Sequence, residues 1–276
     1  EDRARSIAHA LLIVYIGIVL VIVLISALGP EIEWDAVAYH LPAAKAMVQS
    51  RGFKGLPDIP VTYFPKNVEI LFSLGMILHS EITAKLVHFL FGLLTLIATY
   101  GFAKRFHSQT VGLLAVAILV SSPIFIWEMR TAHIDCGFAF AVFASVYAMV
   151  IWLETEKPSW FWLAAFFTAW SLGTRYQALF SLGALASLVF IWILRRQRNL
   201  RIASLQAGRF FLFASIGLVP WGIVDLIQTG NPVFPLLNGI FKSPYWSAQQ
   251  TNNILAQQAG SGVPVGLSNW WAVVTN

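Results

Sequence analysis

The sequence predicts an all-α fold, a polytopic transmembrane helical bundle of about seven spanning helices with two surface helices in the first external loop. Of its 276 residues, 58% are hydrophobic and only 11% are charged. Soluble domains are about a quarter charged, so these charges cannot cover a water-facing globule, and the apolar excess must face lipid. The 11 Trp and 21 Phe residues suit helix packing and interfacial belts.

Each predicted span is an apolar segment long enough to cross a bilayer. The first is roughly 20 residues long and has no signal-peptide cleavage pattern, so we expect it to remain as a helix. The chain begins at Glu1 rather than Met and stops soon after Trp270 and Trp271, so we expect a fragment of a longer protein. The predicted spans are residues 7–28, 83–103, 110–127, 134–153, 160–174, 176–194 and 208–228.

Basic residues cluster at alternate ends of these segments. Placing the N-terminus in the cytoplasm puts every cluster inside, as the positive-inside rule requires. This topology also explains the net charge of +5, and we expect no nucleic-acid partner. The clusters are Arg3 and Arg5, Lys104 and Arg105, Lys157, and Arg195, Arg196, Arg198, Arg201 and Arg209.

One short apolar segment decides the topology. As a helix, residues 68–78 would reach only about 17 Å, against a hydrocarbon core of about 30 Å. If they crossed, Lys104 and Arg105 would lie outside, together with the cluster that starts at Arg195. We therefore predict that this segment lies on the outer surface or dips into the bilayer without crossing it.

The predicted membrane module, residues 1–228, contains a long first external loop at about residues 29–82. Residues 229–276 are rich in Asn, Gln, Gly and Pro and are expected to form an external region that leads into a missing C-terminal part. Pro42 should kink the first surface helix or end its first part, and the 68–78 segment is the second surface helix. Apolar residues recur at helical spacing in the first one, namely Trp34, Val37, Ala38, Leu41 and Val48.

Two carboxylates near the outer face need an explanation, because charges at membrane depth are costly. Asp35 is either a first-turn carboxylate favoured by the helix dipole or a general base at the membrane surface. Tyr39, four residues on, would share its helical face, whereas His40 would point elsewhere. Asp135, at the start of the fourth span, either caps its helix or bonds a neighbouring one, or it acts together with Asp35.

Basic side chains complete the candidate site. Arg175 follows Gly173, which marks a break between two short helices, and interrupts an otherwise apolar run. It either snorkels to the interface or binds a phosphate at headgroup depth, since guanidinium is permanently charged and bonds bidentately. Lys66, Arg130 and His133 are weaker candidates, each able to contact lipid headgroups.

Other chemistry finds little support in the sequence. The single Cys136 excludes an internal disulfide and a cysteine zinc site and is expected to pack. His133 lacks the paired spacing of a metal ligand, and Glu69 and Glu128 are expected to be solvated. Phosphate-cradling glycine loops, His-Glu-x-x-His and Gly-x-Ser-x-Gly do not occur in the sequence.

Three motifs, in this order, resemble the GT-C superfamily of polyprenyl-phosphate-dependent glycosyltransferases. They are Trp-Asp-Ala-x-x-Tyr-His-Leu-Pro at Trp34–Pro42, Gly-Thr-Arg-Tyr at Gly173–Tyr176 and Gly-Asn-Pro-Val-Phe-Pro at Gly230–Pro235. The likeness is strongest to bacterial members of the protein O-mannosyltransferase and aminoarabinose transferase type, and it covers most of the chain. It implies a multi-pass protein of the bacterial inner (plasma) membrane with its active site on the extracytoplasmic face.

The resemblance also implies roles for single residues. Asp35 and Asp135 would be the catalytic carboxylates, and Arg175 would hold the phosphate of a polyprenyl-phosphate sugar donor. Some family members bind a divalent metal, for which Asp35 and Asp135 would be the ligands here, and this point stays open. The candidate substrate contacts are Tyr39, His40, His133 and Tyr176.

These residues fit displacement at an anomeric carbon, which needs a base for the acceptor hydroxyl and a cation for the departing phosphate. Asp35 is the predicted base, and Arg175, with Arg130 and Lys66, the predicted cationic group. Inversion at the sugar is expected, because no covalent intermediate is needed. Two alternatives remain, a non-catalytic membrane subunit of a larger complex that keeps this scaffold and, less favoured, a transporter, whose charges would lie at the bilayer midplane.

Overall fold

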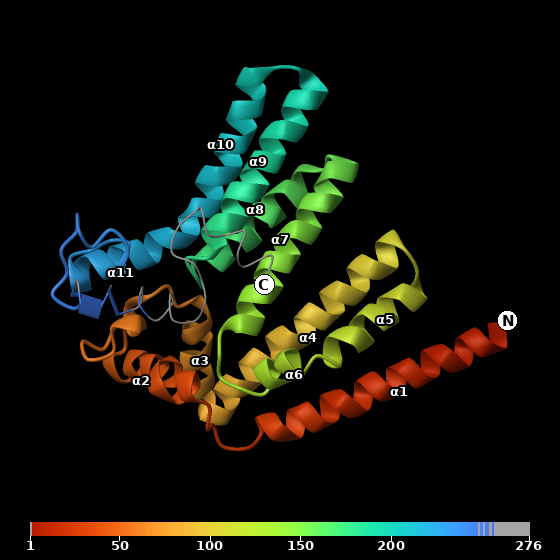
Figure 1. Ribbon diagram of the computed structural model, residues 1–276, viewed down its shortest axis with the longest axis horizontal. Coiled ribbons are helices and arrows are strands. Elements are labelled where there is room, and N and C mark those ends of the chain that lie inside the picture. Colours follow the sequence, from red (N-terminus) through yellow and green to blue (C-terminus); the bar gives the residue numbers. More distant parts are fainter. Residues whose placement is uncertain (1, 248, 251, 254–255, 257–276) are drawn as a thin grey trace.

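The computed structural model describes residues 2–247, 249–250, 252–253 and 256, and it builds them from helices joined by turns and loops (Figure 1). Much of the predicted external region 229–276 therefore lies outside the described residues. The helices are α1 (Asp2–Ala27), α2 (Leu41–Ser50), α3 (Asn67–Leu78), α4 (Glu81–Phe106), α5 (Gln109–Val120), α6 (Pro123–Met129), α7 (Asp135–Thr155), α8 (Pro158–Leu172), α9 (Ala178–Gln197), α10 (Leu200–Ser215) and α11 (Val219–Thr229).

Five stretches of the described chain are helices long and apolar enough to cross a membrane, which confirms a polytopic helical membrane protein. They are α1, α4, α7, α9 and the run Leu200–Thr229, and a sixth is counted if α5 and α6, bent by 77°, form one broken span. The expected number of about seven is too high by this measure. Pro123 lacks the amide that would continue α5, and the 15 residues of α8 reach about 22 Å, short of a core of about 30 Å.

The long helices form a fan whose basic ends lie along one rim, opposite α2 and α3 (Figure 1). Side-chain contacts on this rim join α1 to α5, α4 to α7, and α9 to the turn after α7. All four basic clusters therefore lie on the same side of the molecule, as the positive-inside pattern requires. The contacts are His9 to Thr110 at 2.8 Å, Arg105 to Glu154 at 3.2 Å, and Arg196 to Glu156.

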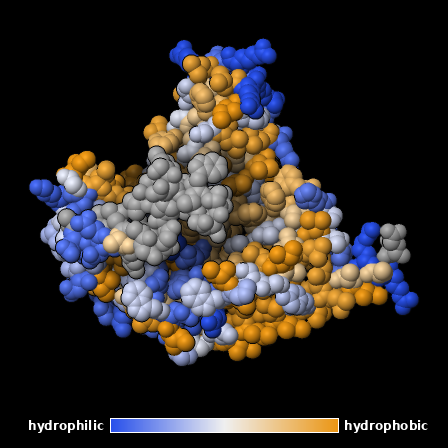
Figure 2. Space-filling model, in the orientation of Figure 1, coloured by the Kyte–Doolittle hydropathy of each residue, from blue (hydrophilic) through white to orange (hydrophobic). Residues whose placement is uncertain are grey.

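Hydrophobic residues cover the flanks of the fan, and hydrophilic residues gather at its tips (Figure 2). On α1, for example, Leu11, Ile18 and Ile25 are more than half exposed. A helix with such a surface is stable only if lipid covers it, because apolar patches this large are rare on soluble monomers.

The short apolar segment forms α3, whose 12 residues span about 18 Å and cannot cross a bilayer alone. It packs against both α2 and α4. Ahead of α2, residues Ala36–His40 form a π-helical turn, and Pro42 lies in the first turn of α2. The break expected at Pro42 is thus confirmed, since its missing amide interrupts α-helical hydrogen bonding there.

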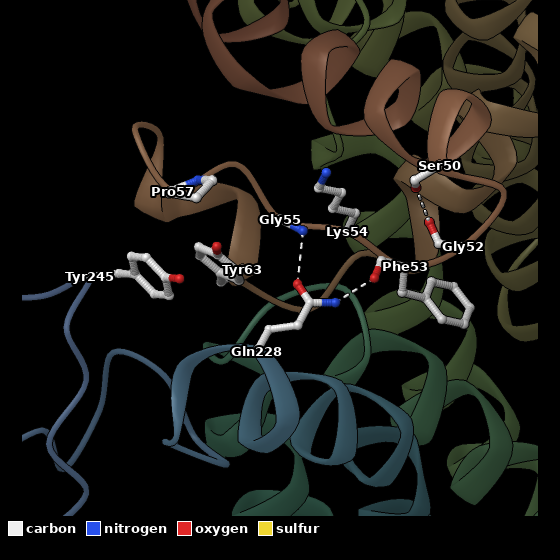
Figure 3. A pocket seen from close by; sticks show the side chains of 9 residues that line it. All are labelled: Ser50, Gly52, Phe53, Lys54, Gly55, Pro57, Tyr63, Gln228 and Tyr245. Atoms are coloured by element: carbon white, nitrogen blue, oxygen red, sulfur yellow. Dashed lines mark hydrogen bonds between the residues drawn. The ribbon is translucent and has the colours of Figure 1, made fainter.

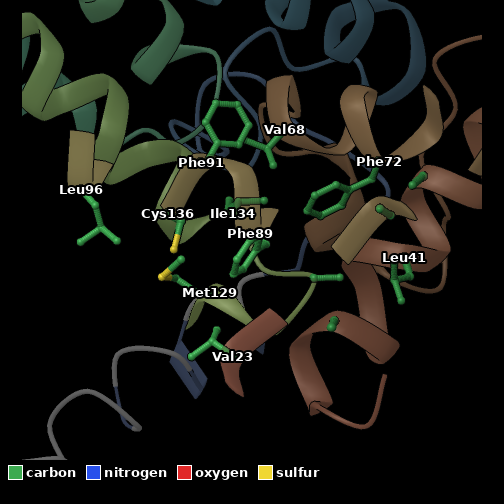
Figure 4. Close-up of a cluster of buried hydrophobic side chains, with 14 of the residues drawn as sticks. Val23, Leu41, Val68, Phe72, Phe89, Phe91, Leu96, Met129, Ile134 and Cys136 are labelled. Carbon is green, nitrogen blue, oxygen red and sulfur yellow. The ribbon is translucent and has the colours of Figure 1, made fainter. Parts of the chain in front are cut away.

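A cluster of buried apolar side chains supports this end of the fan (Figure 4). Val68 and Phe72 of α3 are fully buried in it, and Met129 of α6 fills the space that Gly92 leaves open on α4. Cys136 packs here as a buried thiol, as predicted. A second cluster lies between α7, α8, α9 and α10.

His88, fully buried on α4, holds the loop that leads into α7. Its Nδ1 lies 2.9 Å from the carbonyl oxygen of Glu128 and 2.8 Å from that of Thr131, and its Nε2 lies 2.9 Å from the amide nitrogen of Cys136. Carbonyl oxygens only accept, so Nδ1 carries the proton, and Nε2 accepts from an amide in the first turn of α7, where helix donors lack partners. One neutral imidazole therefore sets the place of Asp135.

Replacing His88 with Leu is expected to lower the free energy of unfolding by about 2–5 kcal/mol, because each buried backbone group left unpaired costs about 1–3 kcal/mol. Denaturant unfolding in detergent, followed by Trp fluorescence, measures this loss. The control is His79→Leu, at the exposed end of α3, which should change stability by less than about 0.5 kcal/mol. Equal stability of the two variants would contradict the role given to His88.

Asn67, the first residue of α3, joins three segments that are distant in sequence. Its amide nitrogen donates to the carbonyl of Gly173 at 2.9 Å, and its side chain donates to the carbonyl of Trp170 at 3.1 Å and accepts from the Trp221 indole at 3.1 Å. A Cβ at Gly173 would overlap the Asn67 side chain. Glycine is therefore required here by the close approach of two chain segments rather than by its backbone angles.

Substituting Gly173 with Ala is expected to cost about 1–3 kcal/mol of stability, since Asn67 must move and part of its hydrogen bonding is lost. Gly183→Ala is the matched control, because a Cβ at Gly183 would meet nothing within 4 Å. In the middle of α9 that change should be neutral or stabilising by up to about 1 kcal/mol. Thermal unfolding of both variants in the same detergent tests the difference, and a Gly173→Ala protein as stable as the control would show that the two segments can separate freely.

Candidate active site

The end of the fan opposite the basic rim holds a cavity of about 920 Å³. Its walls come from all three motifs singled out in the sequence. Trp34–His40 form one wall, the turn Thr174–Gln177 the next, and Pro235 and Leu236 the third, while Glu69 closes the deep end. Motifs that are far apart along the chain thus line one space.

Asp35 is held in this space by the segment just before it. Glu31 accepts a hydrogen bond from the amide of Ala132 at 2.7 Å, and Glu33 accepts one from the indole of Trp127 at 2.9 Å. Trp127 lies near the end of α6, and Ala132 lies in the loop between α6 and α7. This is the region that the hydrogen bonds of His88 hold in place. The Asp35 carboxylate makes no capping hydrogen bond to the helix that follows.

Tyr39 hydrogen-bonds the Asp35 carboxylate, as their spacing predicted. Burial first, and then the bond to and charge of Asp35, raise the pKa of the Tyr39 hydroxyl well above its ordinary value, although the Arg175 guanidinium opposes this. The hydroxyl is therefore a donor at neutral pH. Because Tyr39 also senses the charge of Asp135, these four side chains share one electrostatic environment.

His40 does not pair with Asp35, as expected, but it lines the same cavity. Its Nδ1 lies 2.8 Å from Oε1 of Glu69, and its ring contacts that of Tyr39 in a tilted arrangement, with centroids 4.3 Å apart. Both members of the His40–Glu69 pair are buried. The expectation that Glu69 is solvated is therefore wrong, because α3 folds back and brings Glu69 into contact with His40 of the first motif.

Arg175 and Asp135 form a bidentate ion pair. The distances are 2.6 Å from Nη1 to Oδ1 and 3.1 Å from Nη2 to Oδ2, a geometry typical of guanidinium with carboxylate. Both side chains are about one-third exposed, and Arg175 lines the cavity. Asp135 thus bonds the segment between α8 and α9 rather than capping its own helix.

Tyr176 is fixed by the third motif. Its hydroxyl donates to the carbonyl of Phe234 at 3.0 Å, and burial raises its pKa above the ordinary value. Phe234 is fully buried, and the Phe234–Pro235 peptide bond is cis. The buried side chain of Asn231 bonds the amide of Val233 and the carbonyl of Leu236, which shapes this wall of the cavity.

Two predicted phosphate ligands lie outside the cavity lining. Lys66 is buried against the Trp221 ring, with its Nζ 2.8 Å from the carbonyl of Phe64, and burial lowers its pKa to about 8 against the opposing charges of Asp225 and Glu69. Arg130 is more exposed and lies 3.6 Å from Glu33. Of the three predicted phosphate ligands, Arg175 therefore lines the cavity, whereas Lys66 and Arg130 do not.

His133, a predicted substrate contact, also lies off the cavity lining. Its Nδ1 is 3.2 Å from Oε2 of Glu128. Burial alone would lower its pKa, but the bond to Glu128 and the surrounding carboxylates raise it above the ordinary value. Glu128 is partly buried by this contact rather than fully solvated.

A divalent metal was expected, if present, between Asp35 and Asp135. The described residues instead bring together Glu128, His133 and Asp135, with one ligand atom from each within 4.8 Å of the others. Arg175 bonds both oxygens of Asp135, and Nδ1 of His133 bonds Glu128. Nε2 of His133 is buried without a hydrogen-bond partner among the described residues, so these three side chains, rather than Asp35 with Asp135, are the group that could hold a cation.

A second, shallower cavity of about 420 Å³ lies between the loop after α2 and the end of α11 (Figure 3). Gln228 holds this loop by accepting from the amide of Gly55 at 2.9 Å and donating to the carbonyl of Phe53. Tyr63 and Tyr245 stack face to face on its other side, 5.3 Å apart. Lys54 is the charged residue in its lining, so it lacks the carboxylates of the larger cavity.

One edge of the larger cavity is apolar and open. Trp34, Phe180 and Leu236 line it and are 75%, 82% and 43% exposed. Phe180 lies in the first turns of α9, a helix long and apolar enough to cross a membrane. The same cavity is also lined by the charged side chains of Asp35 and Arg175.

Sequence reasoning missed Glu69, Glu31 and His88, which position the site. Glu31 looks like a surface carboxylate in a loop, whereas Glu69 lies in the short apolar segment and was expected to be solvated. His88 carried a signal, since an imidazole in the middle of an apolar span needs partners.

Comparisons with known proteins agree with this picture. Residues 68–221 match the family model described as dolichyl-phosphate-mannose-protein mannosyltransferase. An uncharacterized protein of Aquifex aeolicus (strain VF5) is 29% identical over 191 residues, 65% of this chain and 37% of that protein. An uncharacterized protein of Shigella flexneri is 30% identical over 64 residues, 23% of this chain and 32% of that protein.

The chain spans about a third of the length of these curated relatives. No solved structure matches it. The family match covers more than half of the chain, from α3 into α11, and includes both Asp135 and Arg175. The chain therefore belongs to the dolichyl-phosphate-mannose-protein mannosyltransferase family.

Proposed function

We propose that this protein is a membrane glycosyltransferase that moves a sugar from a polyprenyl-phosphate donor to an acceptor hydroxyl. The observation that carries the proposal is the single cavity that Asp35 and Arg175 line together with an apolar, exposed edge. A lipid-linked sugar needs this combination, because its tail stays in the bilayer while its phosphate and sugar must reach polar groups. Family membership supports the same class of reaction.

The donor would enter from the lipid side. Its tail would lie along Phe180 and Leu236, and its phosphate would meet Arg175. A guanidinium has five N–H donors, of which two are engaged with Asp135, so the remaining donors can bind phosphate oxygens. Asp135 then acts as the residue that holds Arg175 in place.

Transfer would be a single displacement. The acceptor oxygen forms a bond to the anomeric carbon, its proton passes to the Asp35 carboxylate, and the bond from that carbon to the phosphate oxygen breaks. The electron pair leaves with the phosphate, whose growing charge Arg175 stabilises. Because the acceptor attacks opposite the leaving phosphate, the sugar configuration inverts.

The proposal places this site on the extracytoplasmic face of a bacterial inner (plasma) membrane. The basic rim at the other end of the fan supports this orientation, because cytoplasmic connections carry an excess of Lys and Arg. The partners proposed are the polyprenyl-phosphate sugar and membrane lipid.

A second candidate function is a non-catalytic membrane subunit that keeps the scaffold within a larger complex. Such a subunit would need only the packing and the topology of the helices. The intact cavity and its ordered polar end favour the enzyme instead, since a purely structural subunit has no need for a carboxylate and a guanidinium in one lined space.

Asp35→Asn is expected to reduce sugar transfer by at least about 10³-fold, since Asn cannot accept the proton but can still accept the Tyr39 hydrogen bond. Donor binding and thermal stability should stay near the wild-type values. Transfer from a mannosyl polyprenyl phosphate, in membranes carrying the protein, measures the loss. Asp58→Asn, an exposed carboxylate of the same loop, is the control with unchanged turnover; substantial turnover by Asp35→Asn would reject the base assignment.

Arg175→Gln is expected to weaken binding of a polyprenyl phosphate about 10- to 100-fold, because charge-assisted hydrogen bonds contribute about 1.5–3 kcal/mol. Titration of the purified protein in nanodiscs with farnesyl phosphate gives the dissociation constant. Arg130→Gln removes the same charge outside the cavity and should change binding less than about threefold. Similar losses in both variants would mean that the phosphate is attracted by general surface charge rather than held at Arg175.

A further inference from the structure

The deep end of the cavity contains a buried carboxylate–imidazole pair that the proposed displacement does not use. His40 and Glu69 are 4% and 5% exposed, and their side chains meet at 2.8 Å between Nδ1 and Oε1. Both residues line the cavity. A buried pair of this kind is costly to desolvate, so its position beside the candidate base calls for an explanation.

The pair determines which atom of His40 is presented to the cavity. An ionised carboxylate only accepts hydrogen bonds, so Nδ1 carries the proton that Glu69 receives. With Nδ1 engaged, the neutral imidazole has an unprotonated Nε2 as its second polar atom. Since the ring lines the cavity, this nitrogen is the group left to accept a hydrogen bond there.

Local packing fixes the ring further. The Tyr39 ring packs against it at a tilt, with centroids 4.3 Å apart, and the centroid of the His133 ring lies 6.0 Å away. Glu69 is anchored on α3, and its second oxygen, Oε2, is buried without a hydrogen-bond partner in the described part of the chain. Such an unsatisfied group is rare in native structures and calls for an explanation.

We propose that His40, oriented by Glu69, forms a hydroxyl-recognition subsite that binds the sugar of the lipid-linked donor. The inference rests on the proposed function and deepens it. Nε2 of His40 would accept a hydrogen bond from one free hydroxyl of the sugar. Glu69 is then a positioning residue that acts through His40.

The donor sugar, rather than the acceptor, is the partner that the geometry favours. The sugar is bonded directly to the phosphate, and the phosphate would lie at Arg175 in the same cavity. Tyr39 links the two residues, because its ring contacts His40 and its hydroxyl senses the charge of Arg175. His40 and Arg175 line the same cavity, so a sugar bonded to a phosphate at Arg175 would occupy the space that His40 also lines.

The test compares two lipids with the full chain in nanodiscs, namely farnesyl phosphate and farnesyl phosphate carrying mannose. His40→Ala is expected to weaken binding of the mannosyl lipid about 10-fold, which corresponds to ~1.4 kcal/mol. Binding of the bare lipid phosphate should change less than twofold. His79→Ala, an exposed imidazole at the far end of α3, is the control and should affect neither lipid.

Glu69→Gln tests the positioning role, since a neutral amide no longer enforces one tautomer of His40. Alone it should weaken mannosyl-lipid binding about threefold to tenfold, and added to His40→Ala it should weaken binding no further. Additive losses in the double variant would overturn the positioning role, because Glu69 would then act without His40.

The outcomes separate the subsite from the reaction class. Equal weakening of both lipids by His40→Ala, or no weakening of either, would overturn the subsite while leaving the transferase intact. If the wild-type protein bound neither lipid, the proposed donor itself would be wrong, and the subsite with it. Thermal unfolding of each variant shows whether a loss comes from misfolding, and in that case His40→Gln, which keeps a polar side chain of similar length, replaces His40→Ala.

Discussion

The contacts of Asn67 are the constraint on which the rest of the structure depends. This one side chain and its amide connect the start of α3 to the end of α8 and to α11. α3 is too short to cross the bilayer, so its position is not set by the membrane. The hydrogen bonds of Asn67 set the position of α3 instead. They bring Glu69 and the loop before α3 against the turn that carries Arg175.

Two basic residues at this end of the fan, Lys66 and Arg175, lie near opposite charges. They differ in whether their charged group still reaches the cavity. Lys66 is buried against Trp221, near the opposing charge of Asp225, and its geometry gives it no access to the cavity. Arg175 is held by Asp135 but still reaches the cavity. A buried cation serves the fold, while a partly exposed one in a lined space can meet a ligand. Position within the fold, rather than residue type, therefore separates these two basic residues.

The sequence predicts the bundle and the principal site residues because those features have local or periodic signals. Apolar length marks the spans, the basic clusters give the common rim, and Asp35, Asp135 and Arg175 are charges in unexpectedly apolar surroundings. Glu69 also lies among apolar residues, but its partner has no local signal, because the contact depends on α3 folding back beneath His40, 29 positions earlier in the chain. The bend at Pro123 was also missed, since hydropathy averages over a break that one proline introduces.

The two carboxylates predicted to be catalytic, Asp35 and Asp135, differ in their surroundings. Asp135 accepts hydrogen bonds from both terminal nitrogens of the Arg175 guanidinium, so its lone pairs are largely used and its charge is compensated. Asp35 faces the cavity, and its partner is the hydroxyl of Tyr39, which brings no positive charge. A proton acceptor needs an available lone pair and an uncompensated negative charge at the place where the proton is released. By this argument Asp35, rather than Asp135, is the candidate base, and Asp135 contributes by holding the cation that the leaving phosphate requires.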